Sequence, residues 1–134
     1  MDLRDDVFVP VAKRLRDRAD SLREVRRFRR SGIEGWLKVE AVAALGQKIE
    51  ALQNKGPDLL LRTGDKIQLK AATDLNIQYI REGATKYGTP CIFLGDGDDG
   101  ERIERISGGG VKLVDRQVLS DGVNQWVVGI VAPE

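Results

Sequence analysis

Asp58, Gln68 and Lys70 are polar side chains set in two short apolar segments of the chain. The stretch over residues 56–70 reads as two strands joined by a glycine-containing turn. Hydrolysis of a phosphodiester needs a hard cation, and Mg²⁺ binds a few oxygen ligands while it keeps several waters. Asp58 offers a carboxylate oxygen, Gln68 an amide oxygen and Leu69 a backbone carbonyl oxygen. These residue types predict a site for Mg²⁺ or Mn²⁺.

Lys70 follows Gln68 by two residues, so both side chains project from the same face of the predicted strand. Its ammonium group can hold the attacking water or stabilise the charge that develops on the phosphoryl group. A role as general base would require Lys70 to lose its proton, which the anionic Asp58 opposes. We therefore expect Lys70 to position water and to supply positive charge.

The turn between the two strands decides whether Asp58 and Lys70 share a face. A two-residue turn would pair Leu59 with Lys70 and leave Asp58 on the opposite face. A three-residue turn of residues 63–65 would pair Asp58 with Lys70, and Gly64 suits the positive φ of such loops. We predict the odd-numbered loop, or a bulge that restores its parity.

A fourth group lies upstream, in a predicted helix. Ser31 and Glu34 have the spacing of a capping box, which predicts a helix over about residues 32–53. Glu40 lies in this helix, and its neighbours three and four residues away are apolar, so its carboxylate is expected to face the interior. These neighbours are Trp36, Leu37, Ala43 and Ala44. Burying an unpaired carboxylate is unfavourable, and a bound cation or Lys70 would account for it.

In this order the residues resemble the PD-(D/E)XK nuclease superfamily, whose core is a glutamate-bearing helix, a strand with an aspartate and a strand with an acidic-x-lysine element. The matching positions are Glu40, Asp58, Gln68 and Lys70. Gln68 departs from the usual acid and is similar to the variant of Mrr-like restriction nucleases. The resemblance covers about residues 31–95.

The resemblance implies a restriction-endonuclease-like α/β fold, with a mixed central sheet flanked by helices. It also implies cleavage of DNA with Mg²⁺ or Mn²⁺ as cofactor, in a restriction, repair or mobile-element setting. Because one such site cuts one strand, it further implies a homodimer. The expected metal ligands are Asp58, Gln68, Glu40 and the carbonyl of Leu69, with Lys70 beside the attacking water.

Two other functional classes stay open. The first is a nuclease-fold module that binds nucleic acid without cutting it. Gln68 favours this class because it brings no charge to offset that of a metal ion. The other is a small assembly protein in which strand and turn propensities alone account for Asp58, Gln68 and Lys70. Metal binding separates the nuclease from the binding module, and affinity for nucleic acid separates that module from the assembly protein.

The amino-acid composition limits which catalytic groups and cross-links the chain can have. The chain of 134 residues is 41% apolar and suffices for one hydrophobic core. It has no histidine, which excludes a histidine-based catalytic relay, and its single cysteine excludes an intramolecular disulfide. That cysteine, Cys91, lies in an apolar run and is predicted to be a buried strand residue. No apolar run is long enough to span a membrane and no signal peptide is apparent, so we expect an intracellular, cytoplasmic protein.

Charge is placed unevenly along the chain. Residues 1–32 hold ten basic and six acidic side chains (+4), whereas residues 33–134 hold twelve and fifteen (−3). We predict a basic helical extension over residues 1–31, helical from Pro10 onward, and a nuclease-like α/β domain over residues 32–134. The extension carries an arginine cluster, namely Arg23, Arg26, Arg27, Arg29 and Arg30. These arginines either contact DNA phosphates or pack against the domain or a second subunit, and their spacing leaves both open.

Further elements are predicted downstream. Asp74 has the character of a helix cap, before a helix over residues 75–87. The apolar run over residues 90–94 reads as a strand, and a helix between two strands favours their parallel pairing. Residues 95–100 form an acidic turn that lacks the spacing of a calcium loop. Another strand is predicted over residues 125–131.

Overall fold

The computed structural model describes residues 1–28, 32–72, 76–97 and 101–134, without the side chains of residues 27, 28, 72 and 101. In chain order its helical elements are η1 (Leu3–Phe8), α1 (Val9–Asp17), α2 (Ala19–Phe28), α3 (Gly32–Leu45), η2 (Gly46–Lys48), α4 (Ile77–Thr85) and α5 (Glu101–Glu104). Its strands are β1 (Ile49–Leu52), β2 (Leu59–Leu61), β3 (Lys66–Ala72), β4 (Cys91–Asp96), β5 (Val111–Ser120) and β6 (Gln125–Pro133).

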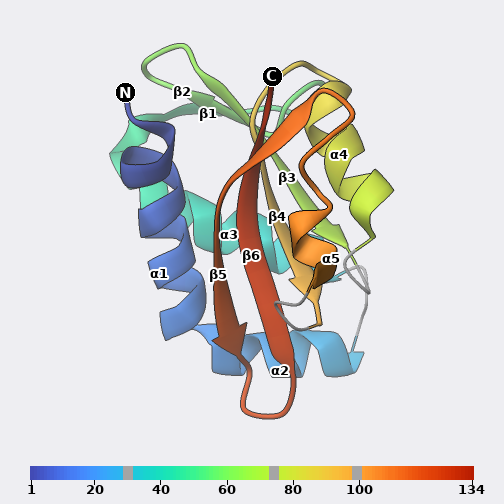
Figure 1. Cartoon of the computed structure of the whole chain (residues 1–134). Helices are drawn as coiled ribbons and strands as arrows, with labels where there is room; N and C mark the ends of the chain where they lie inside the picture. Colours follow the sequence, from blue (N-terminus) through green and yellow to red (C-terminus); the bar gives the residue numbers. More distant parts are fainter. Residues whose placement is uncertain (29–31, 73–75, 98–100) are drawn as a thin grey trace.

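The strands form a single mixed sheet in the order β1-β2-β3-β4-β6-β5 (Figure 1). Strands β3 and β4 are parallel and are joined through α4, whereas every other neighbouring pair is antiparallel. The predicted α/β class with a mixed sheet flanked by helices is therefore confirmed. The strands predicted over residues 90–94 and 125–131 are confirmed as β4 and β6.

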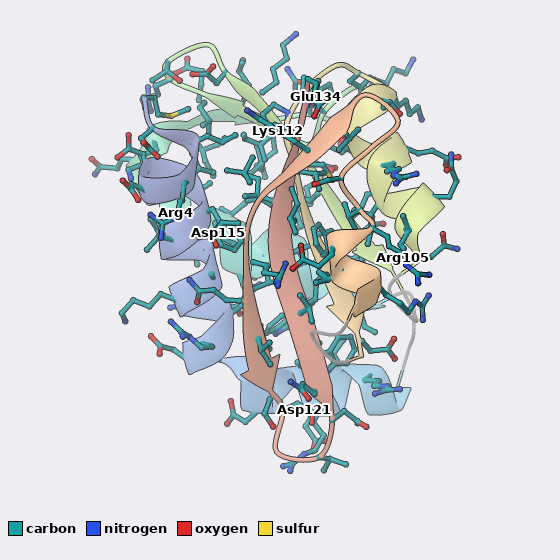
Figure 2. The ribbon with its side chains drawn as sticks, viewed as in Figure 1. Arg4, Arg105, Lys112, Asp115, Asp121 and Glu134 are labelled. Carbon is teal, nitrogen blue, oxygen red and sulfur yellow. The ribbon has the colours of Figure 1, made fainter. Side chains whose placement is uncertain are left out.

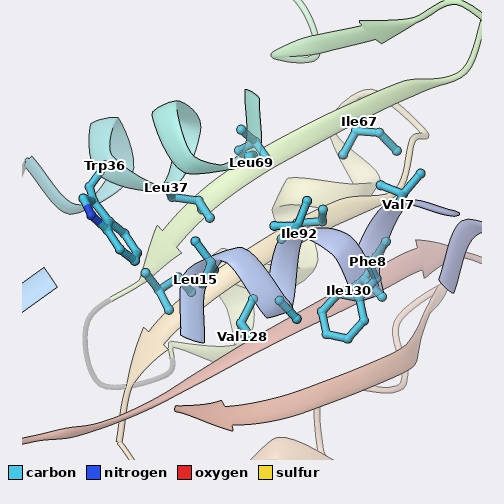
Figure 3. Packing of buried hydrophobic residues seen from close by; sticks show 14 of the residues in the cluster. Val7, Phe8, Leu15, Trp36, Leu37, Ile67, Leu69, Ile92, Val128 and Ile130 are labelled. Atoms are coloured by element: carbon cyan, nitrogen blue, oxygen red, sulfur yellow. The ribbon is translucent and has the colours of Figure 1, made fainter. Parts of the chain in front are cut away.

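Each face of the sheet has its own apolar layer. Helices α1, α2 and α3 pack on one face, where Ile92 and Leu94 of β4 point (Figure 3). Helices α4 and α5 cover the other face, which receives Cys91 and Phe93. This alternation is the period of two that a strand buried on both sides requires. Cys91 is buried in a strand, as predicted.

The N-terminal helices belong to the main core. Val7, Phe8, Leu15 and Leu22 are fully buried in the same cluster as α3 and the sheet. The boundary predicted at residue 31 thus separates segments that share one core. The helix predicted from Pro10 is two helices, α1 and α2, with a break at Arg18.

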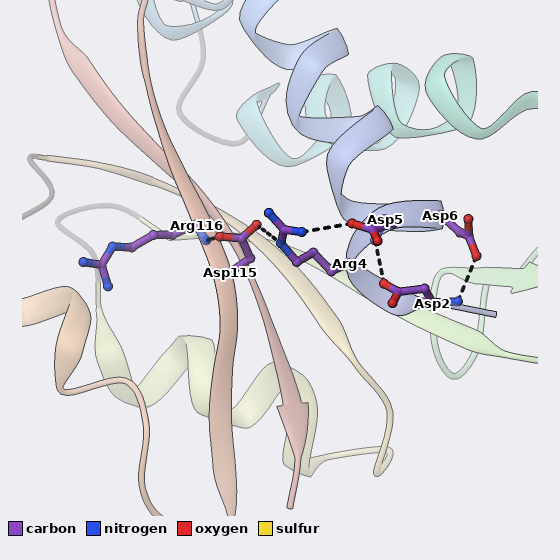
Figure 4. A network of polar contacts seen from close by, with 6 residues as sticks. All are labelled: Asp2, Arg4, Asp5, Asp6, Asp115 and Arg116. Atoms are coloured by element: carbon purple, nitrogen blue, oxygen red, sulfur yellow. Dashed lines mark hydrogen bonds and ion pairs between the residues drawn. The ribbon is translucent and has the colours of Figure 1, made fainter.

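A polar network ties the first turn of the chain to β5 (Figure 4). Arg4 Nε donates to Asp115 Oδ2 at 2.8 Å, and the Arg4 guanidinium also pairs with Asp5 at 3.0 Å. The Asp2 carboxylate accepts from the N–H of Asp5, and the Asp6 carboxylate accepts from the N–H of Asp2, each at 2.8 Å. Because these groups are largely exposed, they orient the N-terminal turn more than they stabilise it.

The helix predicted over residues 32–53 is too long. Helix α3 ends at Leu45, where Gly46 takes a left-handed conformation with φ of 52° that glycine adopts without strain. The chain then enters β1, which is held by pairing with β2. Ser31 of the predicted capping box lies outside the described residues.

The predicted helix cap at Asp74 also lies outside the described residues. Helix α4 begins at Ile77, and Asn76 caps it by accepting a hydrogen bond from the N–H of Tyr79 at 3.1 Å. None of the helices in the described part of the chain combines the length and the apolar character needed to span a membrane.

Gly129 offers a direct test of the sheet register. It pairs with Phe93 of β4 and with Arg116 of β5, and a Cβ at this position would overlap the Phe93 ring. We expect Gly129→Ala to lower the free energy of unfolding by about 1–3 kcal/mol, measured by urea denaturation. Gly35→Ala is the matched control, because Gly35 lies on α3 and a Cβ there would meet no atom within 4 Å beyond its chain neighbours and the adjacent backbone of its own helix. That change should stabilise the protein by about 0.5–1 kcal/mol, and equal effects of the two substitutions would contradict the register.

Candidate functional site

The loop between β2 and β3 sets the relative position of the candidate residues. The N–H of Leu61 donates to the carbonyl of Asp65 at 2.8 Å, so the hairpin loop is the three residues 62–64. Gly64 occupies the last loop position with φ of 91°, as three-residue hairpin loops commonly require. The predicted odd-numbered loop is confirmed, but it lies one residue earlier than the predicted 63–65.

This shift changes which residues face each other. The pairs Leu59 with Ile67 and Leu60 with Lys66, continued by one position, place Asp58 opposite Gln68. The predicted partner, Lys70, lies two residues further on the same strand. Asp58, Gln68 and Lys70 still share one face, because opposite residues and alternate residues point the same way.

The edge of β3 beyond β2 is covered by carboxylates. Strand β2 pairs only with the first residues of β3, so the later N–H groups on that edge have no partner among the described strands. The N–H of Leu69 donates to Asp58 Oδ2 at 3.0 Å. The backbone of Ala71 hydrogen-bonds the carboxylate of Glu34, which reaches across from α3. Two acids from different elements therefore meet along one short piece of strand edge.

Glu34 is the residue that sequence reasoning missed at this site. Burial raises the pKa of its carboxyl group most, and the negative charge of Asp58 raises it further. The hydrogen bond from Ala71 and the charges of Lys70 and Lys38 act in the opposite direction without cancelling the rise. The Glu34 residue as a whole is exposed, so the desolvated part is the carboxyl group that points at β3. Its position in the first turn of α3 was the available signal, but that signal predicted only a capping role.

Lys38 adds a positive charge beside Asp58. Its Nζ lies 3.7 Å from Asp58 Oδ1, and its side chain is 35% exposed. Lys38 follows Glu34 by four residues and so lies on the same side of α3. With Lys70, the group therefore combines two carboxylates and two ammonium groups.

The chemistry of the donor set fits a hard cation. The side-chain amide oxygen Oε1 of Gln68 is buried and has no hydrogen-bond partner among the residues that the structure describes. The carbonyl of Leu69 points to the same edge as its N–H, toward Asp58. Two carboxylates, an unpaired amide oxygen and a backbone carbonyl are ligands that Mg²⁺ accepts. In the described part of the chain, no three His, Cys, Asp or Glu side chains gather as a metal-binding group, so such a site would depend on Gln68 and Leu69.

Lys70 lies against α4. Its Nζ is 3.7 Å from the centroid of the Tyr79 ring, well within the range of a cation–π interaction. Below the ring its methylene stem passes Gly83, where a Cβ would come within 3.2 Å of Lys70 Cδ. The buried Cys91 thiol lies next to this stem, and burial raises the pKa of that thiol.

Glu40 does not join this group, which corrects the sequence prediction. Its carboxylate is buried and accepts a hydrogen bond from Arg14 Nε at 2.7 Å, with Arg18 Nε at 4.0 Å. The expected compensation by a cation or by Lys70 is therefore supplied by α1. Glu40 follows Lys38 by two residues, which turns it about 200° around the helix axis. It faces α1, while Glu34 and Lys38 face β3.

Asp121 is the other buried acid among the described residues, and it is also explained by local structure (Figure 2). Burial acts to raise the pKa of its carboxyl group, but hydrogen bonds from the backbone and side chain of Asn124, from Trp126 and from the backbone of Val123 outweigh it and lower the pKa. Asp121 thereby holds the turn between β5 and β6. We assign it a structural role.

The arginine cluster is only partly within the described residues. Arg26 pairs with Asp96 at 3.0 Å, and its guanidinium lies 5.3 Å from the Trp126 ring centroid. Arg23 lies 3.8 Å from a carboxylate oxygen of Glu24. Arg26 thus packs against its own sheet, in agreement with the packing alternative. Arg29 and Arg30 lie outside the described residues, as does the side chain of Arg27.

The candidate group lies along the part of the β3 edge that β2 does not pair with. A separate hollow of about 530 Å³ is lined by Met1, Asp6, Gln47, Lys48, Leu61, Arg62 and Thr63, which include none of the candidate residues.

The ion pair of Glu40 can be tested by stability. We expect Arg14→Ala to lower the free energy of unfolding by about 1–3 kcal/mol, because it leaves a buried carboxylate with only the more distant Arg18. Lys13→Ala is the matched control on the same helix, since the Lys13–Asp17 pair is exposed and its loss should change the stability far less. Equal losses in urea denaturation would contradict the structural role of Arg14.

The raised pKa of Glu34 predicts a pH-dependent stability difference. An acid whose folded pKa exceeds its unfolded pKa stabilises the protein below the unfolded value, and this stabilisation is lost as pH rises through the folded pKa. Glu34→Gln should therefore unfold at higher urea concentration than the wild type at pH 7.5, and this gain should vanish below the ordinary glutamate pKa. Glu50→Gln, at an exposed position of β1, is the control and should show no such gain. A Glu34→Gln difference that is independent of pH would contradict the interpretation.

Comparison of the chain with protein-family models, curated proteins and solved structures finds no match. The functional proposal therefore rests on the geometry and chemistry of the described residues.

Proposed function

We propose that the chain is a nuclease that hydrolyses DNA phosphodiester bonds with Mg²⁺ or Mn²⁺. The observation that carries the proposal is the meeting of Asp58 and Glu34 on the edge of β3, the strand that also bears Lys70 and Gln68 with its buried, unpaired amide oxygen. The chain contains, in this order, a helix with an acid, a strand that follows an aspartate and a strand with Gln-x-Lys. The PD-(D/E)XK resemblance implies the same order. Glu34 takes the place first given to Glu40.

The proposed ligands of the metal ion are Asp58, Glu34, Gln68 and the carbonyl of Leu69. When bound, the ion would offset the negative charge of the transferring phosphoryl group and favour ionisation of the attacking water. Binding would also favour the charged form of Glu34, whose pKa is raised without the ion.

The two lysines have separate proposed roles. Lys70 is set on the face of Asp58 and Gln68, where its ammonium can donate a hydrogen bond to the attacking water and stabilise charge on phosphorus. Lys38 is partly exposed and can turn from Asp58 to a phosphate oxygen of the DNA. A homodimer would bring two such sites to a duplex, one for each strand.

A second candidate is a nucleic-acid-binding module that does not cut. The observation in its favour is the charge balance of the group, because Lys38 and Lys70 offset Asp58 and Glu34. Without a third acid at position 68, a cation would meet a group with no net negative charge. Binding of DNA through the lysines would still be favoured.

The proposal is tested by incubating wild-type protein with supercoiled plasmid, branched DNA and single-stranded DNA in Mg²⁺, Mn²⁺ or EDTA. We expect metal-dependent cleavage by the wild type, and a fall in its rate of about 10²-fold or more in Lys70→Ala, because a preorganised charge is lost from the reacting group. Calorimetric titration with Mn²⁺ should show that Asp58→Ala loses metal binding while Lys70→Ala keeps it. Lys66→Ala is the matched control, since Lys66 is exposed on the same strand.

The same assay separates the two glutamates. Glu34→Gln should impair both Mn²⁺ binding and cleavage, whereas Glu40→Gln should retain both in the folded protein. Cleavage that is equal in wild type and Lys70→Ala would contradict the nuclease assignment. DNA binding without metal binding or cleavage would favour the second candidate.

A further inference from the structure

We propose that Tyr79 and Gly83 of α4 form a cradle that positions the Lys70 ammonium for the reaction, an inference that rests on the nuclease function proposed above. The two residues are four positions apart on one helix, so they present neighbouring surfaces on the same side. Tyr79 contacts the charged end of Lys70 and Gly83 lies against its stem.

The Tyr79 ring acts on the charged end. With Nζ 3.7 Å from the ring centroid, the ammonium lies over the electron-rich face, which attracts a cation. The backbone of Tyr79 is itself fixed, because its N–H donates to the Asn76 cap. The ring is therefore carried by the capped first turn of α4.

Gly83 makes the close approach possible. A Cβ at this position would lie 2.6 Å from Cys91 Sγ and 3.2 Å from Lys70 Cδ. Any larger residue would push α4 away from β3 and β4 or displace the lysine stem. The absence of a side chain thus lets Lys70 lie flat against the helix, with its end at Tyr79.

The electrostatic surroundings keep the ring in its neutral form. Burial raises the pKa of the Tyr79 phenol most, and nearby negative charges, first that of Glu34, raise it further. A neutral ring holds the ammonium by its quadrupole, without a charge that would neutralise it. Lys70 can then keep its hydrogen-bond donors for water and phosphate.

The proposal predicts that catalysis depends on the ring of Tyr79 and not on its hydroxyl group. We expect Tyr79→Leu to lower kcat about five- to thirtyfold with little change in KM, because a cation–π contact is lost while DNA and metal contacts remain. Tyr79→Phe keeps the ring face and should retain kcat within about twofold. Tyr87→Leu is the matched control, because it removes the contact of Lys86 with the Tyr87 ring at 5.1 Å and should leave kcat unchanged.

NMR provides a readout that needs no activity. The ε-methylene protons of Lys70 are on the carbon bonded to Nζ, which lies over the Tyr79 ring, so they should resonate upfield of those of other lysines through the ring current. This upfield shift should persist in Tyr79→Phe and disappear in Tyr79→Leu. For the stem, Gly83→Ala should be made in a Cys91→Ala background, which removes the clash with sulfur and leaves the contact with Lys70 Cδ. That variant should fold and show a displaced Lys70 signal.

Different failures have different meanings. An unshifted Lys70 signal in the wild type, or equal kcat losses in Tyr79→Phe and Tyr79→Leu, overturns the cradle even if the protein cuts DNA. Unchanged kcat in a folded Tyr79→Leu variant overturns its positioning role. A shifted Lys70 signal in a wild type that cleaves no DNA overturns the nuclease function and, with it, the catalytic role of the cradle.

Discussion

The backbone N–H groups of Leu69 and Ala71 must be satisfied on an edge of β3 that β2 is too short to cover. An unpaired backbone donor away from water is unfavourable, so the chain needs acceptors there. Asp58 and Glu34 provide them as carboxylates, one from the strand start and one from α3. This single requirement draws two acids to the strand that also carries Gln68 and Lys70. The candidate site is thus a consequence of how a sheet edge is completed.

The carboxylates of Asp58 and Glu34 repel each other, and the positive charges of Lys38 and Lys70 offset this repulsion only in part. Lys38 and Lys70 oppose the rise in the pKa of Glu34, yet burial and the charge of Asp58 prevail. The group retains an acid whose ionised form is disfavoured. Such perturbed acids gather at functional sites, because an incoming cation would relieve the disfavoured charge. The same lysines reduce the net charge available to that cation, which is the physical basis of the binding-module alternative.

Short apolar runs and strand alternation made much of the sheet predictable, and packing between distant segments made the rest unpredictable. The strands β4 and β6 follow from continuous apolar runs, which are buried on both faces, whereas the shared face of Asp58 and Lys70 follows from alternation. The missed strand β5 has mixed burial over most of its length, so its sequence shows no clear alternation. The hairpin register depends on where Gly64 falls in the loop, and parity alone does not determine it. The predicted length of α3 was too great. Gly46 ends this helix, and the amphipathic pattern of the sequence does not mark that end.

The sequence around Glu34 and Glu40 does not determine which of the two carboxylates lies at the β3 edge. The apolar neighbours of Glu40 correctly predict that its carboxylate faces the interior, but they do not identify the positive charge that pairs with it. That charge belongs to Arg14, twenty-six positions earlier, on a helix that packs against α3. Glu34 looked like a capping residue, since its neighbours along the helix gave no sign that the free edge of β3 lay opposite. An acid at the start of a helix can serve a strand edge and a metal site alike, because both need carboxylate oxygens held in a fixed direction. Its assignment therefore requires knowledge of the surface that the helix faces.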